Sequence, residues 1–227
     1  MDIETIKDSK NKHIPYLICG YNGSRYITSF GLNQKVLFAE FIKNLLTFFE
    51  SRKRTLTVYT HNLSNFDGIF LMNQIIQFGK VKPQSFHGRL ISLNLILTIK
   101  GHKNKTLIFK DSMLMLPLSL RQLCDSFKVK TIKSYFPYAF TNIFYTGVLP
   151  QIQHWSNIPL YEYQLLLKEY TGIEWNFKKE AVKYCKLDCQ ALHEILVKFN
   201  ELIYSNYKVN ISGSLTLPSL AMKIYSF

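Results

Sequence analysis

The sequence has few cysteines, and their spacing does not suit a zinc site. The four are Cys19, Cys124, Cys185 and Cys189, and no two of them form a Cys-x-x-Cys pair. A tetrahedral zinc site would need further Cys or His side chains at suitable spacing, which the chain does not offer. We therefore expect buried thiols in a protein of a reducing compartment.

Long apolar stretches are absent as well. The chain has no run of about 18 apolar residues, so the sequence predicts no transmembrane helix and no membrane partner. The N-terminus has neither an apolar signal core nor an Arg-rich amphipathic presequence, and no internal repeat is visible. These absences argue against a membrane-spanning or repeat architecture.

Acidic residues are scarce relative to basic ones. Among 227 residues there are 15 Asp and Glu against 28 Lys and Arg, which gives a formal net charge of +13. A hydrophobic content of 47% with 19% charged residues indicates a globular protein with a sizeable core, in one large or two small domains. A basic surface around a few acidic residues suits a polyanionic partner, although a generally basic, soluble surface is the alternative.

The stretch Y-T-H-N-L-S-N-F-D-G-I-F at 59–70 organises the chain. It follows a strand-like run and precedes an apolar helical run, so Asp67 could simply cap that helix. Its neighbours favour a second interpretation, because they add amide donors and an aromatic face to the carboxylate. Those neighbours are His61, Asn62, Asn65 and Phe66. A protein that holds an unpaired nucleic-acid end needs this mixture of stacking, phosphate contacts and a metal ligand.

Further carboxylates stand near both ends of the chain. Asp2 and Glu4 are two residues apart, so in a strand they project from one face and repel each other unless a cation lies between them. Tyr184 and Asp188 are four apart in a long helical pattern, so they share one helix face. Together with Asp67, these residues predict a site of four carboxylates with a tyrosine beside the last.

The pattern of the remaining chain predicts an α/β fold with a mixed sheet. Strands are expected at 2–6, 14–21, 25–30, 55–59, 89–99 and 105–109. Helices are expected at 36–49, 69–78, 118–127, 161–170 and 177–204, with a last one from residue 217. The stretch 141–159 has three turn signals and little periodicity, which indicates a long surface loop.

Two further segments could contact a ligand. Asp111 and Ser112 follow the last expected strand and could hold phosphate or bases, but a plain helix entry explains them equally well. Basic and aromatic residues interleave over 130–140, as at a single-strand track. An aromatic loop packed on the core is the alternative for that segment.

The chain resembles the 3′–5′ exonuclease domain of protein-primed family B DNA polymerases, which linear plasmids of fungal and plant mitochondria and some phages carry. Five segments stand where that family has its motifs: D-I-E-T at 2–5, H-N-L-S-N-F-D-G at 61–68, K-D-S at 110–112, F-P-Y-A-F at 136–140 and Y-C-K-L-D-C at 184–189. The resemblance implies a ribonuclease-H-like exonuclease fold with a mixed central sheet and flanking helices. It also implies a mitochondrial location.

The chain departs from that family in two ways. Asp2 directly follows Met1, whereas the family has several strand residues before this motif, so the first strand is expected to be clipped. The polymerase motifs are absent, so the expected organisation is an exonuclease domain at 1–208 and, at 209–227, the start of a segment leading to a polymerase domain. Such a chain would not synthesise DNA by itself. A polymerase domain or a terminal protein encoded elsewhere is an expected partner.

The chemistry that the resemblance implies is two-metal phosphodiester hydrolysis at a single-stranded DNA 3′ end. Two Mg²⁺ or Mn²⁺ ions about 3.5–4 Å apart would clamp the attacking and leaving oxygens. By resemblance Asp2 bridges both ions, Glu4 and Asp188 complete the ion that activates water, and Asp67 supports the other. Tyr184 would orient the water and Lys133 would steady the scissile phosphate.

The resemblance also supplies the residues that would hold the frayed 3′ end. They are Thr5, Tyr59, His61, Asn62, Phe66, Phe70, Ser112, Met113 and Tyr135 or Tyr138. Two alternatives stay open beside an active DNA exonuclease. One is a decayed remnant that only binds single strands. The other is an RNA exonuclease of the same superfamily, although related RNases mostly use His where this chain has Tyr184.

Overall fold

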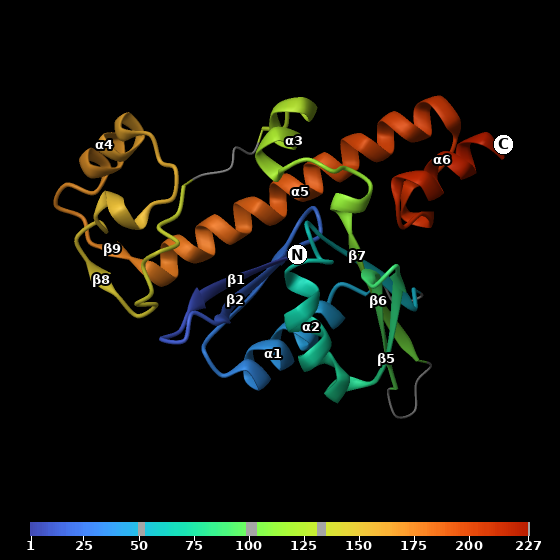
Figure 1. Cartoon of the computed structure of the whole chain (residues 1–227), viewed down its shortest axis with the longest axis horizontal. Coiled ribbons are helices and arrows are strands. Elements are labelled where there is room, and N and C mark those ends of the chain that lie inside the picture. The colour runs from blue at the N-terminus through green and yellow to red at the C-terminus, as the bar shows by residue number, and fades with distance from the viewer. Residues whose placement is uncertain (50–52, 99–103, 131–134, 227) are drawn as a thin grey trace.

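Two sheets and one long helix make up most of the molecule in the computed structural model (Figure 1), which describes residues 1–49, 53–98, 104–130 and 135–226. The first sheet is an antiparallel meander of β1 (Asp2–Lys7), β2 (His13–Tyr21) and β3 (Tyr26–Phe30), in that order. The second has the order β4-β7-β6-β5, from β4 (Thr55–Thr60), β5 (Lys80–Phe86), β6 (Arg89–Leu97) and β7 (Lys105–Asp111). It is a mixed sheet, because β4 and β7 run parallel while the other pairs run antiparallel.

The helices surround these sheets. They are α1 (Gln34–Leu46), α2 (Asp67–Ile75), α3 (Leu120–Phe127), α4 (Leu160–Glu169), α5 (Phe177–Tyr207) and α6 (Leu217–Tyr225). Short 3₁₀ turns cover Ile76–Phe78, Ser112–Leu114, Ile152–His154 and Ile211–Gly213, and the two-residue strands β8 (Thr146–Gly147) and β9 (Trp175–Asn176) pair near the start of α5. No helix in the described ranges combines the length and the apolar character needed to cross a membrane.

Strand β2 is buried on both faces, and this explains why helices cover both sides of the meander. Its Ile18 side chain packs in the core that includes α1, whereas Leu17 and Cys19 pack in the core that includes the first half of α5. Successive side chains of a strand point to opposite faces, so a continuous apolar run needs a partner on each face. Figure 1 shows α5 crossing one side of β1 and β2, with α1 on the other side.

Strand β2 has a β-bulge opposite the acidic residues of β1. Glu4 pairs with Leu17 but Thr5 pairs with Pro15, so β2 contributes one extra residue, Tyr16, at this point. Bulges bend and twist a strand locally and are common beside functional sites. The two-residue period of a strand places Asp2 and Glu4 on one face of β1, and β2, which carries the extra residue, bends opposite them.

The two sheets meet at the start of β1. The backbone nitrogen of Met1 donates a hydrogen bond to the carbonyl oxygen of Tyr59 over 2.8 Å. This contact brings the first residues of the chain beside the end of β4, where the central stretch 59–70 begins. Segments almost sixty positions apart in sequence are thus neighbours.

Most of the expected elements are present, with three differences. Strand β5 was not expected, because its residues are almost all exposed and include Lys80, Lys82 and Pro83, which do not give an alternating apolar pattern. The stretch 141–159 is not simply a surface loop, since Ile143, Leu149 and Trp155 are buried in the aromatic core beside α5. The expected helices at 36–49 and 69–78 end earlier, at Leu46 and Ile75.

The last 18 described residues, 209–226, pack on the same body. Val209, Ile211 and Leu220 are buried with residues of α3 and α5. The Lys110 ammonium of β7 donates to the Ser212 carbonyl oxygen at 2.5 Å. The expected boundary at residue 208 therefore stays a prediction about the longer protein, with no break in packing at that position.

Candidate active site

Four acidic side chains from three distant parts of the chain line one open pocket of about 360 Å³. Asp2 and Glu4 come from β1, Asp67 from the first residue of α2, and Asp188 from the middle of α5. Three of them are nearly inaccessible, with 7% of Glu4, 2% of Asp67 and 6% of Asp188 exposed. The pocket thus gathers the four carboxylates that the sequence predicted as a set.

The other walls of the pocket are aromatic, amide and basic. Five of them are among the residues expected to hold a nucleic-acid end: Thr5, His61, Asn62, Phe66 and Tyr138. Three were not anticipated: Ile3, Lys7 and His13. His13 accepts or donates a hydrogen bond at 2.7 Å to the Thr5 hydroxyl and meets the Phe66 ring edge-on, with ring centroids 5.6 Å apart.

Asp67 does not cap helix α2. The N-cap position belongs to Phe66, which makes no side-chain capping bond, and Asp67 is the first helical residue. Within the described ranges the buried Oδ1 atom of Asp67 has no hydrogen-bond partner. Burial, and then the charge of Asp2, hold the pKa of the Asp67 carboxyl well above its usual range. A buried carboxylate oxygen left without a donor is costly unless a ligand satisfies it.

Gly68 allows the turn to pack closely around Asp67. A Cβ atom at position 68 would lie 2.6 Å from the carbonyl oxygen of Leu63 and 2.7 Å from the Leu90 side chain. Neither distance is tolerable for a carbon atom, so the local path of the turn requires glycine here. The residue after the central carboxylate is therefore fixed by sterics.

Asp111 stabilises this turn by hydrogen bonds to its backbone and side chains. Its carboxylate is fully buried at the end of β7, which pairs in parallel with β4 so that Asp111 lies opposite Thr60. It accepts hydrogen bonds from the backbone nitrogens of Asn62 (3.0 Å) and Ser64 (2.9 Å), from the Ser64 hydroxyl (2.7 Å) and from the Met113 nitrogen (2.9 Å). The expected helix entry is present, because Asp111 is the N-cap of the 3₁₀ turn Ser112–Leu114, whereas its bonds to Asn62 and Ser64 were not predicted.

Asn62 and His61 complete the conformation of the turn. Asn62 has φ +74°, a left-handed conformation that asparagine adopts more readily than most residues. His61 donates from Nε2 to the Leu118 carbonyl oxygen at 2.8 Å, and its Nδ1 lies 2.9 Å from the Ser112 hydroxyl. Ser112 itself is fully buried and donates to the Thr60 carbonyl oxygen, so it supports His61 and does not face the pocket.

Tyr138 lines the acidic pocket, and Tyr184, which lines a second pocket, lies directly behind it. The Tyr138 hydroxyl donates to the Tyr184 hydroxyl at 2.6 Å. The pKa of Tyr138 is raised, first by burial and then by the charge of Glu4, and that of Tyr184 is raised by burial and by Asp188. Both hydroxyls therefore keep their protons near neutral pH. Tyr184 is thus linked to the acidic pocket by its hydrogen bond with Tyr138.

The residues present fit divalent metal ions. The donor set is all-oxygen, which hard cations such as Mg²⁺ and Mn²⁺ prefer. The Oδ1 atom of Asp67 is buried without a hydrogen-bond partner in the described ranges, so a bound cation would satisfy an oxygen that the protein itself leaves unpaired. Asp2, Glu4, Asp67 and Asp188 are the side chains that would hold such ions.

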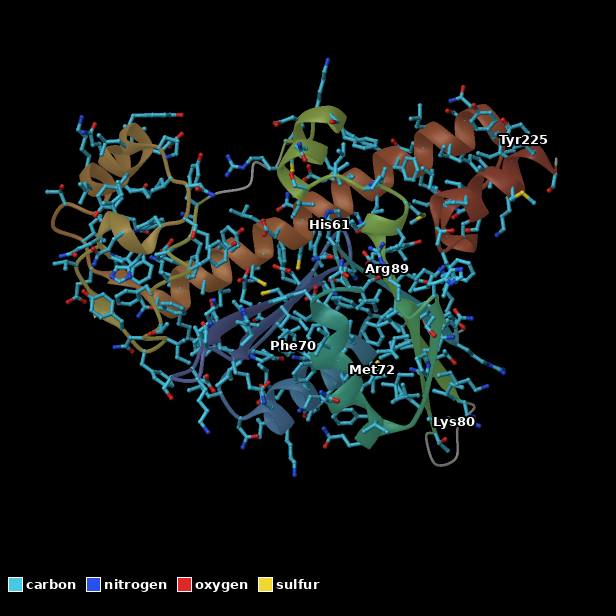
Figure 2. All side chains as sticks on the ribbon, viewed as in Figure 1. His61, Phe70, Met72, Lys80, Arg89 and Tyr225 are labelled. Atoms are coloured by element: carbon cyan, nitrogen blue, oxygen red, sulfur yellow. The ribbon has the colours of Figure 1, made fainter. Side chains whose placement is uncertain are left out.

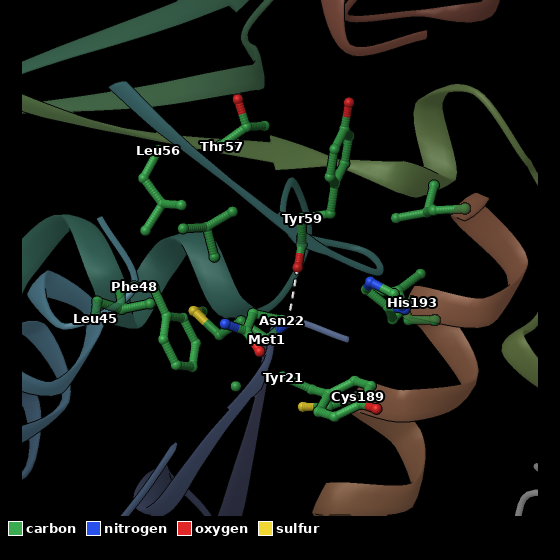
Figure 3. Close-up of a pocket in the computed structure, with 14 residues that line it drawn as sticks. Met1, Tyr21, Asn22, Leu45, Phe48, Leu56, Thr57, Tyr59, Cys189 and His193 are labelled. Carbon is green, nitrogen blue, oxygen red and sulfur yellow. Dashed lines mark hydrogen bonds between the residues drawn. The ribbon is translucent and has the colours of Figure 1, made fainter. Parts of the chain in front are cut away.

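The structure does not bring Tyr59 to this pocket. Strand alternation directs its ring to the opposite face, where it packs against the core of α3 and the second half of α5. Its buried hydroxyl has no hydrogen-bond partner in the described part of the chain, and burial raises the pKa of Tyr59 to about 12. Figure 3 shows a different pocket, of about 270 Å³, to which Tyr59 turns its backbone carbonyl while its ring points away.

The remaining predicted residues that the structure describes do not line this pocket. Phe70 meets Phe66 edge-on with ring centroids 5.3 Å apart and projects from α2 (Figure 2). Tyr135 accepts a hydrogen bond from Arg121 and lines another pocket with it. The Met113 side chain is half-buried. Lys133 lies outside the described residues.

Comparison with known proteins places this geometry in context. The family described as DNA polymerase type B, organellar and viral, matches residues 48–226. A protein of Neurospora intermedia named "Probable DNA polymerase" is 33% identical over 222 residues, which is 93% of this chain and 23% of that protein. One of Ascobolus immersus with the same name is 31% identical over 99% of this chain and 19% of its own length. The chain thus spans about a fifth of the length of these curated relatives.

A solved structure shares the fold. The structure named "Phi29 DNA polymerase complexed with single-stranded DNA" aligns with 98% of this chain and 33% of its own, with a TM-score of 0.59 and 18% sequence identity. The expected α/β fold, of the ribonuclease-H-like exonuclease type with a mixed sheet and flanking helices, is confirmed by this likeness and by the strand order described above.

Proposed function

This chain belongs to the organellar and viral type B DNA polymerases, whose family pattern covers most of it, and on that premise we propose that it is the 3′–5′ exonuclease portion of such an enzyme. The proposed substrate is the 3′ end of single-stranded DNA, and the reaction is hydrolysis of the terminal phosphodiester. The proposed setting is mitochondrial. A polymerase domain or a terminal protein is the proposed partner.

One observation carries the proposal. Four carboxylates converge on one open pocket whose other walls supply an aromatic ring, an amide, a hydroxyl and imidazoles. A single strand needs stacking surfaces for its bases, and hydrolysis needs charge neutralisation at the phosphate. Within about 360 Å³, the pocket offers stacking surfaces and the carboxylates that could hold the cations needed for that neutralisation.

The carboxylates would hold two Mg²⁺ or Mn²⁺ ions, and such ions, when bound, lower the pKa of a water molecule and stabilise the charge of the phosphate. The chain's own contribution is to fix where the carboxylates lie. Asp2 and Glu4 are held by the β1–β2 pairing, and Asp67 is held by the turn that Asp111 braces. Asp188 is held by its position on α5, whose first half is packed in the aromatic core.

The tyrosine pair would act as hydrogen-bond donors. Because the pKa values of Tyr138 and Tyr184 are raised, neither hydroxyl can serve as a base near neutral pH. The Tyr184 hydroxyl, held by Tyr138 at 2.6 Å, would orient the attacking water by donating to it or accepting from it. The chemistry thus divides into ion binding by carboxylates and water orientation by phenols.

The 3′ end would lie along the turn and the β1–β2 edge. The Phe66 ring offers a face or edge to a base, and the Asn62 amide reaches the pocket from its left-handed backbone position. A duplex must melt before its terminal phosphate can reach a pocket of this size. A mispaired end melts at lower cost, which would favour its removal.

The test is a cleavage assay with a 5′-labelled single-stranded DNA. We expect a ladder that shortens from the 3′ end with Mg²⁺ or Mn²⁺ and stays intact with EDTA. A matched RNA strand in parallel separates the DNA enzyme from an RNA exonuclease. Tight strand binding by well-folded protein without any metal-dependent shortening would instead identify a remnant that only binds.

A further inference from the structure

Three cysteines lie directly behind the acidic pocket. Cys19 of β2 is the register partner of Asp2 in β1, and Cys185 and Cys189 are one turn apart on α5. All three are essentially inaccessible, at 0%, 0% and 2% exposure. Burial, followed by the neighbouring thiols of Cys189 and Cys19, raises the pKa of Cys185 well above its usual range.

Cys185 also touches the carboxylates. Its Sγ atom lies 3.7 Å from the Asp2 carboxylate oxygen Oδ2 and 3.7 Å from the Asp2 carbonyl oxygen. One donor atom each from Asp2, Glu4 and Cys185 lie within 4.8 Å of one another. A tetrahedral ion with a thiolate at about 2.3 Å and a carboxylate at about 2.0–2.2 Å separates the two donors by roughly 3.5 Å. The observed sulfur–oxygen distance is close to that separation.

We propose that the floor of the acidic pocket is a site for a thiophilic divalent ion, such as Zn²⁺ or Cd²⁺, which Cys185, Asp2 and Glu4 bind together. Binding forms a metal–sulfur bond and releases the thiol proton to the solvent. Sulfur ligands select this class of ion over Mg²⁺, which takes oxygen ligands.

A second observation points to a cation in the adjoining acidic pocket. The buried Oδ1 atom of Asp67, 2% exposed with its residue, lines the pocket without a hydrogen-bond partner in the described part of the chain. Cys185 does more than fill the core as a small apolar group, because its thiol donates a hydrogen bond to the Asp2 carboxylate and so lies beside the acidic residues.

The site shares Asp2 and Glu4 with the ions of the proposed exonuclease. A thiophilic ion bound there would occupy the carboxylates that Mg²⁺ needs, so Zn²⁺ should inhibit cleavage in Mg²⁺. This consequence rests on the proposed function, whereas the binding itself does not. The two can therefore fail separately.

The experiment titrates Cd²⁺ into the metal-free, phosphine-reduced full chain and follows the ultraviolet thiolate-to-metal charge-transfer absorption without DNA. We expect saturation at one equivalent. Cys185→Ser should lose the absorption and weaken binding by about 100-fold or more, since loss of a direct ligand should exceed the effect of losing an outer partner. Asp2→Asn should weaken binding while keeping the absorption.

Cys124→Ser is the matched control, because Cys124 is also buried but lies in the separate core around α3. It should titrate like the parent. A parent without the charge-transfer absorption, or a folded Cys185→Ser or Cys185→Ala variant that keeps it, would overturn the proposal. If the absorption is present but no Mg²⁺-dependent cleavage occurs, the metal site stands and the exonuclease proposal fails.

Discussion

Asp67 and Asp111 are both buried carboxylates at the same end of the central sheet, but their surroundings differ. Asp111 lies below the turn 61–65 and accepts four hydrogen bonds from backbone and hydroxyl donors. Asp67 lies above the same turn, in the acidic pocket, where its Oδ1 has no donor in the described ranges and its pKa is raised.

The difference separates a structural carboxylate from a ligand-binding one. Hydrogen-bond donors stabilise an ionised carboxylate wherever it must stay fixed, as at Asp111. A carboxylate that is to bind a cation gains from the opposite arrangement, because an unsatisfied oxygen keeps its coordination capacity. The protein alone satisfies the carboxylate of Asp111, whereas it leaves the Oδ1 atom of Asp67 without a donor in the described ranges.

The largest effect should come from changing the acidic pocket. Asp67→Asn removes a charge that would hold a metal ion, so cleavage should fall about 1,000-fold, or about 4 kcal/mol of transition-state stabilisation. The folded protein should be as stable as the parent or more stable, because a desolvated, repelled charge is gone. Single-turnover cleavage with thermal melting measures both. Near-parental cleavage would remove Asp67 from the site.

Asp111→Asn should do the reverse. An amide cannot accept from every donor that the carboxylate satisfies, so the free energy of unfolding should fall by about 3 kcal/mol. Asp8→Asn is the matched control, because Asp8 also accepts two backbone bonds at 2.9 Å but in an exposed turn. It should cost less than about 1 kcal/mol. If urea unfolding showed the same loss of stability for both variants, Asp111 would not stabilise the turn as we describe.

Tyr184→Phe tests the tyrosine pair beside the acidic pocket. Loss of one hydrogen bond to the attacking water should slow cleavage by roughly 10- to 150-fold, or about 1.5–3 kcal/mol, while metal and strand affinities stay near parental. Tyr145→Phe is its control, since the Tyr145 hydroxyl donates to the Val148 carbonyl oxygen in the same aromatic core, away from the pocket. A silent Tyr184→Phe would leave the tyrosine as packing only.

Metal should stabilise the pocket by mass action. At about ten times the dissociation constant, Mn²⁺ should raise the free energy of unfolding of the parent by about 1.4 kcal/mol. The same Mn²⁺ concentration should raise the free energy of unfolding of Asp67→Asn clearly less. For Asp111→Asn, if it folds, the rise should equal that of the parent. Differential scanning calorimetry with and without Mn²⁺ gives the comparison. Equal gains in parent and Asp67→Asn would place the ion elsewhere.

The smallest effect concerns pH in the absence of metal. Because the folded-state pKa of Asp67 is raised, folding takes up a proton between the unfolded and folded values. The stability of the parent should therefore fall as pH rises through that window. Asp67→Asn lacks this contribution, so its advantage over the parent should grow with pH in urea unfolding. If the stability of Asp67→Asn relative to the parent fell with rising pH, the ionised carboxylate of Asp67 would not destabilise the folded protein.

The four carboxylates of the acidic pocket could be predicted from the sequence because they stand in recognisable motifs. Within a strand or a helix, the spacing of two residues shows whether they share a face. Asp2 and Glu4 needed only the two-residue period of β1. The role of Asp111 was not predictable in this way, since it depends on the parallel register that places it opposite Thr60. Tyr59 was assigned to DNA although strand alternation turns its ring to the other face.

His13 illustrates the same limit. It was overlooked because an isolated histidine at the start of a strand carries no pattern. The β1–β2 pairing sets it opposite Lys7, and the two line the pocket beside Thr5. The sequence does not predict strand β5 for a related reason. Its residues are exposed and show no alternating pattern, so the strand is recognised by its pairing with β6.

Anomalous diffraction from a Mn²⁺-soaked crystal of this protein would test the central claim most directly. The account predicts anomalous peaks within ligand distance, about 2.0–2.2 Å, of carboxylate oxygens of Asp2, Glu4, Asp67 and Asp188. Asp111, whose oxygens already accept four hydrogen bonds, should show none. An ordered pocket without a peak at saturating Mn²⁺, or a peak at Asp111 in its place, would contradict the account.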